Sequence, residues 1–177
     1  DAAQYLRQRL PGVQVGITVT AGGWLGSNVQ RWLDLTASSD VMIATYYPLQ
    51  ADYSVQPPQA PAQDFPALLQ LAGSKQLVLQ EVGYPSSTLN GSSEAMQAEF
   101  FHQVFAAWRD SDGRIPFLSL FLLHDIASDL VDVFTVYYGV PDPKFRAYLD
   151  SIGLRNRDNT DKLAWPAVVE EAAATAL

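Results

Sequence analysis

Glu81 closes an aliphatic run in the segment LVLQEVGYPSS, which spans residues 77–87. A carboxylate at the end of a buried strand is costly to desolvate unless another group pairs with it or a reaction uses it. The chain then turns at Gly83 and Pro85, which are residue types typical of turns. Two interpretations follow: Glu81 is a solvated carboxylate where a strand meets a loop, or it is a carboxylate used in chemistry at the mouth of a site.

Polar and aromatic side chains follow the ends of all four predicted strands. These residues are Thr20, Trp24, Tyr46, Tyr47, Tyr84, His124 and Asp125. Parallel α/β folds build their sites at the edge of the sheet where the strands end. Tyr46 and Tyr47 are adjacent, so only one of them can face the same side of the sheet as Glu81. The same alternation predicts that Leu77 and Leu79 lie on the side of Glu81 and form an apolar floor below its carboxylate.

The two histidines and a tyrosine pair leave alternatives open. His124-Asp125 suggests an acid/base or metal pair, whereas a loop histidine beside a capping aspartate is the other interpretation, because adjacent strand residues point in opposite directions. His102 lies in a helical segment and is predicted to be structural, and Tyr137-Tyr138 either lines a cleft or covers the core. No histidine or carboxylate cluster has metal-ligand spacing, and no glycine-rich segment has the phosphate-binding fingerprint. The sequence therefore predicts neither a metal nor a cofactor.

The elements that position these residues alternate along the chain. Helical spacing and capping signals predict helices at 1–10, 28–35, 64–72, 93–110, 142–152 and from about 166, with Asp64 as an N-cap. Runs rich in β-branched and aliphatic residues predict strands at 13–20, 40–49, 76–81 and 115–125, and the segment after the last strand is predicted to be an aromatic loop. Strands that alternate with helices indicate an α/β fold with a parallel sheet, here as a single domain of residues 1–177.

The composition excludes several classes of protein. Apolar residues make up 48% of the 177 residues, and charged residues make up 17%, which is typical of a folded domain rather than a disordered segment. The net charge of −8 argues against binding to nucleic acid or to an anionic membrane surface. The absence of cysteine excludes disulfides and thiolate metal sites, and no apolar run is long enough to span a bilayer.

Three motifs resemble those of the retaining (β/α)8-barrel glycoside hydrolases. LQEVGYPSS resembles the segment in which the nucleophilic glutamate of those enzymes ends the seventh strand, followed by a turn of glycine, aromatic residue, proline and serine. TYYPL (45–49) resembles the end of their sixth strand, and SIGLRNRDNTDKLAW (151–165) resembles their tail. The resemblance covers essentially the whole chain, as the C-terminal half of a barrel with strands five to eight.

The resemblance implies a function for several of the residues. It implies that Glu81 is the nucleophile, that Tyr46 or Tyr47 orients it, and that the substrate is a β-linked polysaccharide or oligosaccharide. It also implies a set of substrate-binding residues, namely Trp24, Tyr84, His124 and Asp125, of which the two aromatic residues offer ring faces to sugars. Extracellular or periplasmic localisation is expected on the same basis.

The sequence departs from the family in three respects. A full barrel takes about 250 residues, and the strand that carries the acid/base glutamate would precede Asp1. The segment FLLHDIASD also lacks the tryptophan expected near the end of strand eight. The alternative function is therefore a non-catalytic carbohydrate-binding or scaffold protein with a degenerate barrel. Four strands of an open barrel leave two unpaired edges, so either a homodimer or pairing with an N-terminal half barrel is expected.

Overall fold

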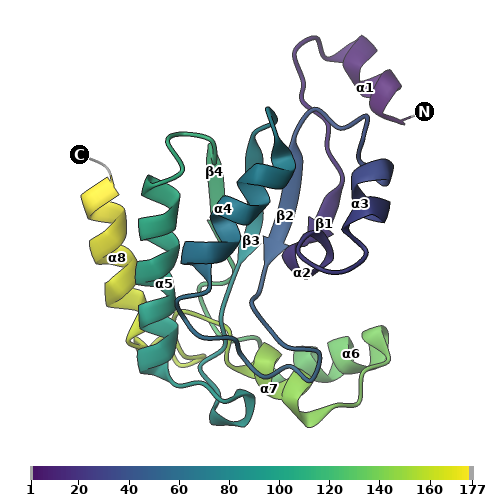
Figure 1. Ribbon diagram of the computed structural model, residues 1–177. Coiled ribbons are helices and arrows are strands. Elements are labelled where there is room, and N and C mark those ends of the chain that lie inside the picture. The colour runs from purple at the N-terminus through teal and green to yellow at the C-terminus, as the bar shows by residue number, and fades with distance from the viewer. Residues whose placement is uncertain (1, 176–177) are drawn as a thin grey trace.

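Four parallel strands in sequential order form the sheet in the computed structural model, which describes residues 2–175 (Figure 1). The strands are β1 (Thr18–Thr20), β2 (Met42–Tyr46), β3 (Leu77–Val82) and β4 (Phe117–Leu120). Each strand is shorter than, or shifted from, the run that predicts it, because only part of each run pairs with a neighbour. The α/β fold class with a parallel sheet is confirmed.

Helices cover one face of this sheet. The helices α4 (Pro61–Ala72), α5 (Glu94–Arg109) and α8 (Ala164–Thr175) lie side by side in front of the strands in Figure 1. The short helices α2 (Ala21–Trp24) and α3 (Val29–Leu35) lie beside β1, and α1 (Ala2–Arg9) lies near the amino ends of the strands. On the uncovered side, Thr18 and Gln80 are exposed and share a hydrogen bond.

The main core lies between the sheet and the helices. Leu77, Leu79 and Val82 of β3 are fully buried there, in one cluster with Phe65 of α4 and Phe100 of α5. Burying such side chains supplies most of the free energy that holds helix to sheet. Two leucines of β3 therefore face the helices, and the apolar floor predicted below Glu81 is wrong.

A β-bulge in β3 explains this difference. Ala44 pairs with Leu79, but the next residue, Thr45, pairs with Glu81, so Gln80 is an extra residue in the strand. Regular alternation would put Glu81 on the same face as Leu79, but the extra residue of the bulge turns Glu81 to the opposite face. The carboxylate of Glu81 is thus on the side away from the buried leucines.

Two helices lie beyond the carboxyl ends of the strands, at the bottom of Figure 1. They are α6 (Ser128–Tyr138) and α7 (Pro143–Asp150), and with the segment after β4 they form a second apolar cluster that includes Ile126, Val131, Phe145 and Tyr148. The aromatic loop predicted at 133–141 is wrong for residues 133–138, because these belong to α6, which Val131 and Phe134 anchor.

The helix starts agree in part with their capping signals. Asp142 caps α7 by accepting from the backbone N–H of Lys144, and Ser93 caps α5 by accepting from the backbone N–H of Met96, each at the first residue of a predicted helix range. Asp64 is not the N-cap of α4, because the helix begins three residues earlier at Pro61 and Asp64 lies in its first turn. The final helix begins at Ala164 rather than near residue 166. None of the helices in residues 2–175 is long and apolar enough to cross a membrane.

The docking of α8 on α5 gives a pH-dependent prediction. Glu171 accepts from Arg109 at 2.6 Å and pairs with His102 at 2.7 Å, and these partners hold the pKa of its carboxyl below the usual value despite partial burial. A lowered pKa in the folded state stabilises the fold above the unfolded pKa, and this stability is lost as pH falls through the folded pKa. We expect Glu171→Gln to lower Tm by a few degrees at neutral pH and progressively less toward acid pH.

The exposed neighbour Glu170 is the matched control for this measurement. Glu170→Gln should leave the pH dependence of Tm unchanged. A Glu171→Gln deficit that stays constant, or grows, toward acid pH would contradict the assignment of the pH dependence to this ion pair.

The open edges of the sheet predict association. β1 and β4 each pair on one side only, and Ile17 and Phe117 beside and within them are about half exposed. Unpaired edges and exposed apolar side chains favour pairing with another chain. We expect sedimentation velocity at micromolar concentration to show dimers or larger species. A stable monomer that binds no hydrophobic dye would contradict this.

Candidate functional site

Glu81 lies at the carboxyl end of the sheet, next to the last residue of β2 and its successor. The hydroxyl of Tyr47 donates a hydrogen bond of 2.7 Å to Oε2 of Glu81. Gly83 permits this approach, since a Cβ at that position would meet the Tyr47 ring at 2.8 Å and the backbone oxygen of Phe121 at 2.6 Å. A charged carboxylate that accepts a hydrogen bond in a partly buried place is held in a defined orientation.

Two tyrosines near the carboxylate keep their protons. Burial, the neighbouring Tyr148 and the carboxylate of Glu81 raise the pKa of Tyr47 far above its usual value. Burial and the same carboxylate raise the pKa of Tyr148, whose ring lies edge-on to that of Tyr47 at 5.7 Å. The Tyr47 hydroxyl is therefore a lasting donor to Glu81 over the pH range in which the protein is folded.

Tyr46 points the other way, as the alternation along a strand requires. Its hydroxyl donates to Oδ2 of Asp64 at 2.7 Å, and its ring packs on Phe65 and Phe100 in the core. Burial raises the pKa of Asp64, while the hydrogen bond from Tyr46 lowers it. Of the two tyrosines, Tyr47 is the one that the structure places on Glu81.

The two predicted substrate-binding aromatic residues lie in the core. Trp24 is 2% exposed, and its ring N–H donates to the backbone oxygen of Ile43. Tyr84 is fully buried, stacks on Phe100 at 4.7 Å and donates to the backbone oxygen of Gln56. The prediction that these rings stack on sugars is wrong, because neither ring has a face open to a ligand.

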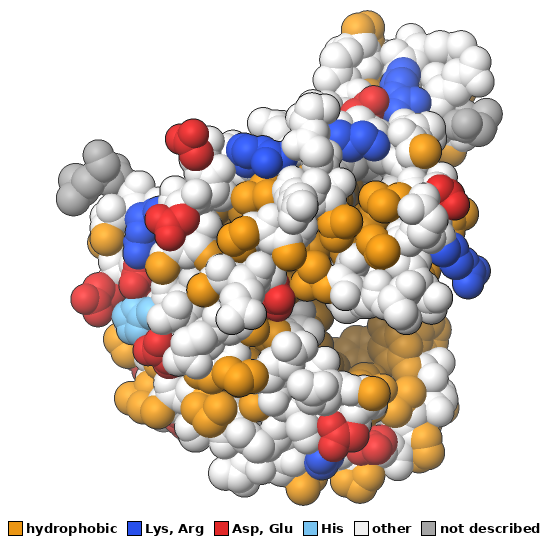
Figure 2. Space-filling model, in the orientation of Figure 1, with side chains coloured by type: hydrophobic (Ala, Val, Ile, Leu, Met, Phe, Trp, Pro, Cys, Tyr) orange, Lys and Arg blue, Asp and Glu red, His pale blue; other side chains and the backbone are white. Residues whose placement is uncertain are grey.

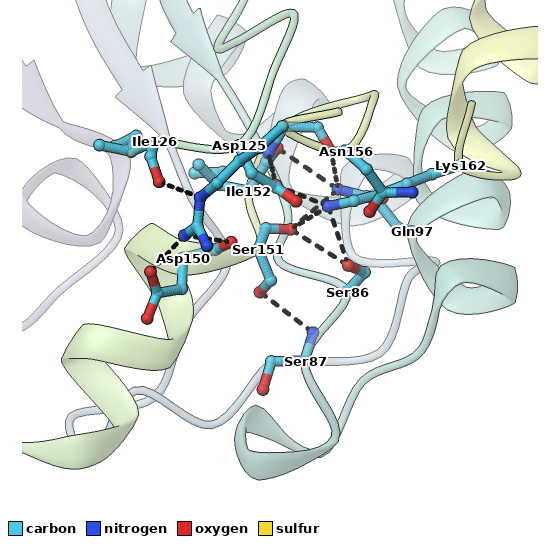
Figure 3. A network of polar contacts seen from close by, with 12 residues as sticks. Ser86, Ser87, Gln97, Asp125, Ile126, Asp150, Ser151, Ile152, Asn156 and Lys162 are labelled. Carbon is cyan, nitrogen blue, oxygen red and sulfur yellow. Dashed lines mark hydrogen bonds and ion pairs between the residues drawn. The ribbon is translucent and has the colours of Figure 1, made fainter. Parts of the chain in front are cut away.

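Asp125 also makes contacts within the fold. Its Oδ1 accepts from Nζ of Lys162 at 2.6 Å and from the backbone N–H of Gly153 at 2.9 Å, and both ends of the ion pair are at least nine-tenths buried (Figure 3). Burial raises the pKa of Asp125, and Lys162 opposes this rise. These contacts give Asp125 a structural role at the carboxyl edge of the sheet, and its role in substrate binding stays a prediction. His124 is partly buried at the edge next to β4, where its backbone pairs with Arg155.

The Lys162 ammonium joins three loops at the carboxyl edge of the sheet. Besides Asp125, it donates to Oγ of Ser86 at 3.2 Å and to the backbone oxygen of Ser151 at 3.0 Å. The buried amide of Gln97 donates to the backbone oxygens of Tyr84 and Gly153 close by. Figure 3 shows Ser86, Asp125 and Lys162, from the segments after β3, after β4 and after α7, pointing toward one another beside Gln97 of α5. The sequence motif at 151–165 contains Lys162, but nothing in the sequence singled out Gln97.

A cavity of about 250 Å³ opens beside Glu81. Phe121, at the end of β4, forms one wall, and its ring lies 6.2 Å from that of Tyr47. Tyr138 of α6 and Phe145 of α7 form the opposite side. Phe121 lies near the strand end at which the resemblance expects tryptophan. Its place in the site was not predicted, because it lies within a run of apolar residues typical of a buried strand.

A second cavity, of about 340 Å³, shares Tyr47 with the first. Its lining includes Asp64, Gln56 and the backbone of Gly22 and Gly26. Figure 2 shows the surface hollowed between α2 and α6. Within residues 2–175, no group of three or more histidine, cysteine, aspartate or glutamate side chains could hold a metal ion.

Comparison with solved structures identifies the architecture. The chain superposes on GH5_18 from Streptomyces cattleya in complex with GlcNAc (TM-score 0.63, 18% identity) over 97% of its length and 39% of that chain. It superposes on native xylanase10C from Cellvibrio japonicus (TM-score 0.64, 13% identity) over 97% of its length and 38% of that chain. It superposes on the exo-β-1,4-mannosidase Op5Man5 from Opitutaceae bacterium strain TAV5 (TM-score 0.64, 16% identity) over 97% of its length and 30% of that chain.

The chain has the fold of part of a (β/α)8 barrel. Its structural neighbours are glycoside hydrolases of this architecture, and the chain spans less than half the length of the three described above. At these identities the likeness concerns the fold. No model of a known protein family and no curated protein matches the sequence.

Proposed function

We propose that the chain is the C-terminal part of a retaining β-glycoside hydrolase in which Glu81 is the nucleophile. The observation that supports this most is the placement of the Glu81 carboxylate. It lies at the edge of the sheet where barrel enzymes carry their sites, is held by the Tyr47 hydroxyl at 2.7 Å, and faces a cavity. The fold shared with glycoside hydrolases that bind GlcNAc or act on xylan and mannosides adds to this support.

The chemistry follows from one placed carboxylate. Glu81 attacks the anomeric carbon, the bond from that carbon to the glycosidic oxygen breaks, and an ester to Glu81 forms. The leaving oxygen takes a proton from a second carboxylic acid, which then activates a water that hydrolyses the ester. Among the described residues that line the cavity, Glu81 is the one carboxylate. The proposal therefore places the acid/base carboxyl in an N-terminal half barrel. It also includes extracellular or periplasmic localisation, which rests on the family resemblance.

Covalent labelling tests the proposal. A 2,4-dinitrophenyl 2-deoxy-2-fluoro-β-glycoside needs little help from an acid, because dinitrophenolate leaves without protonation, and its fluorine slows hydrolysis of the ester. We expect the chain to gain the mass of one fluoro sugar with the glucose, xylose or mannose reagent. Peptide mass mapping should place the sugar on Glu81.

Two variants make the labelling result specific. Glu81→Gln should remove the label, and Asp64→Asn should keep it, because Asp64 is the partly buried carboxyl of the neighbouring cavity. A label on another residue would contradict the nucleophile assignment. Sugar binding without any label would favour the alternative of a non-catalytic carbohydrate-binding protein.

The tyrosine pair gives a further prediction. Tyr47→Phe removes the donor to Glu81, and a hydrogen bond to a charged group contributes about 1.5–3 kcal/mol. We expect this variant to label at least about tenfold more slowly. Tyr46→Phe should label at the normal rate, since its hydroxyl donates to Asp64 instead. Equal effects of the two substitutions on labelling would contradict the placement of Tyr47.

A further inference from the structure

The cavity beside Glu81 is lined mainly by aromatic and aliphatic side chains. Phe121, Phe145 and Leu149 are among them. Its polar side-chain atoms belong to the carboxylate of Glu81 and to three tyrosine hydroxyls. Among the described residues that line it, none is a serine, threonine, amide or cationic side chain. A lining of apolar and aromatic side chains with few polar groups is typical of a pocket that encloses a mostly apolar small molecule.

Two of the tyrosine hydroxyls of this cavity offer little to a ligand. The Tyr47 hydroxyl donates to Glu81, and Tyr148 is 9% exposed with its proton held by burial. A sugar ring enclosed here would exchange water for few partners, and each unsatisfied hydroxyl is costly to bury. An apolar group loses no hydrogen bond on entering and gains from leaving water.

The neighbouring cavity offers the complementary chemistry. Asp64, Gln56 and exposed backbone at Gly22 and Gly26 line it, and Tyr47 borders both cavities. A ligand that passes over Tyr47 would therefore have hydrogen-bonding groups on one side and an apolar enclosure on the other. Such a ligand is amphipathic, with a polar and an apolar part joined near Glu81.

We propose that the substrate is a β-glycoside with an apolar aromatic or alkyl aglycone, and that the aglycone occupies the cavity between Glu81, α6 and α7. This inference rests on the proposed function, because it takes Glu81 as the group that meets the anomeric carbon. Tyr138 of α6 determines the specificity, since it lines the cavity with a ring that is 60% exposed and lies 6.0 Å from that of Phe145.

Binding of stable thioglycosides tests this. Methyl and benzyl 1-thio-β-glycosides of glucose, xylose and mannose present the same sugars with a small or an aromatic aglycone. Isothermal titration of the full chain should give a Kd about tenfold lower for the benzyl than for the methyl compound of at least one sugar. Equal affinities of the two compounds for all three sugars, or binding of neither, would overturn the inference.

A matched pair of variants locates the preference. Tyr138→Ser should reduce the ratio of the two affinities by about threefold or more. Tyr137→Ser is the control, because Tyr137 is the adjacent residue of α6, is 77% exposed, and is outside the cavity lining. Both side chains are exposed, so neither substitution threatens the fold. Equal effects of the two variants would overturn the assignment to this cavity.

The labelling experiment separates this inference from the proposed function. A label on Glu81 together with no benzyl preference overturns the aglycone inference and leaves the nucleophile in place. A benzyl preference that depends on Tyr138, without any label on Glu81, overturns the assignment of the apolar group as a leaving aglycone. A label and a preference together support both.

Discussion

Lys162→Met is expected to lower the free energy of unfolding by about 3–5 kcal/mol, because it leaves the Asp125 carboxylate buried without its cation. The substitution keeps most of the volume of the side chain, so the loss reports the missing charge and its donors rather than a cavity. Ser86 and the backbone of Ser151 lose a donor at the same time. Urea denaturation at neutral pH, followed by tryptophan fluorescence, measures the change.

Lys144→Met is a matched control for this prediction. Lys144 pairs with Asp52 at the same distance of 2.6 Å, but Asp52 is exposed to solvent. An exposed pair contributes far less than a buried one, so this variant should unfold close to the parent. A double variant, Lys162→Met with Asp125→Leu, should recover much of the loss, because it removes the unpaired charge. Equal losses for Lys162→Met and Lys144→Met would contradict the role of burial.

Glu81→Ala has the second large expected effect, on reaction rate. The release of dinitrophenolate from an ordinary dinitrophenyl β-glycoside should fall on the order of 10⁴-fold or more, as expected when a nucleophile is removed. The smaller side chain leaves room for azide beside the anomeric carbon. Azide at high concentration should therefore restore part of the rate.

The configuration of the azide product decides the interpretation. Attack by azide inverts the anomeric carbon once, so the product is an α-glycosyl azide, whereas the parent enzyme inverts twice and retains the β configuration. NMR of the product distinguishes the two anomers. Asp64→Ala is the control and should show neither the loss nor the response to azide. Loss of rate in Glu81→Ala without an α-azide product would count against nucleophilic attack by Glu81.

The sequence predicted the parts of the fold that depend on local pattern. Alternating strands and helices indicated the parallel sheet, and capping residues such as Asp142 and Ser93 marked helix starts. The alternation of adjacent strand residues correctly indicated that Tyr46 and Tyr47 face opposite sides. These features are readable because each depends on residues only a few positions apart.

The features that the sequence missed depend on contacts between distant segments. Trp24 and Tyr84 follow strands, but both rings turn inward to the core, which their position in the sequence does not reveal. The pairing of Asp125 with Lys162 joins residues 37 apart, and the same aspartate appeared beforehand as a substrate ligand. The helix at 128–138 was missed because its aromatic residues suggested a loop rather than a helix anchored by Val131.

The extra residue in β3 changes what the strand presents on the uncovered side of the sheet. Two consecutive polar side chains, Gln80 and Glu81, lie on that side, while Leu79 and Val82 before and after them pack against the helices. Gln80 accepts a hydrogen bond of 2.6 Å from the hydroxyl of Thr18, so the bulge also links β3 to β1 across the uncovered side. Without Gln80, the order Leu79, Glu81, Val82 would follow regular alternation, with Glu81 still on the uncovered side and Val82 toward the helices. Deletion of Gln80 is therefore expected to remove the link to Thr18 rather than to turn the carboxylate to the other face.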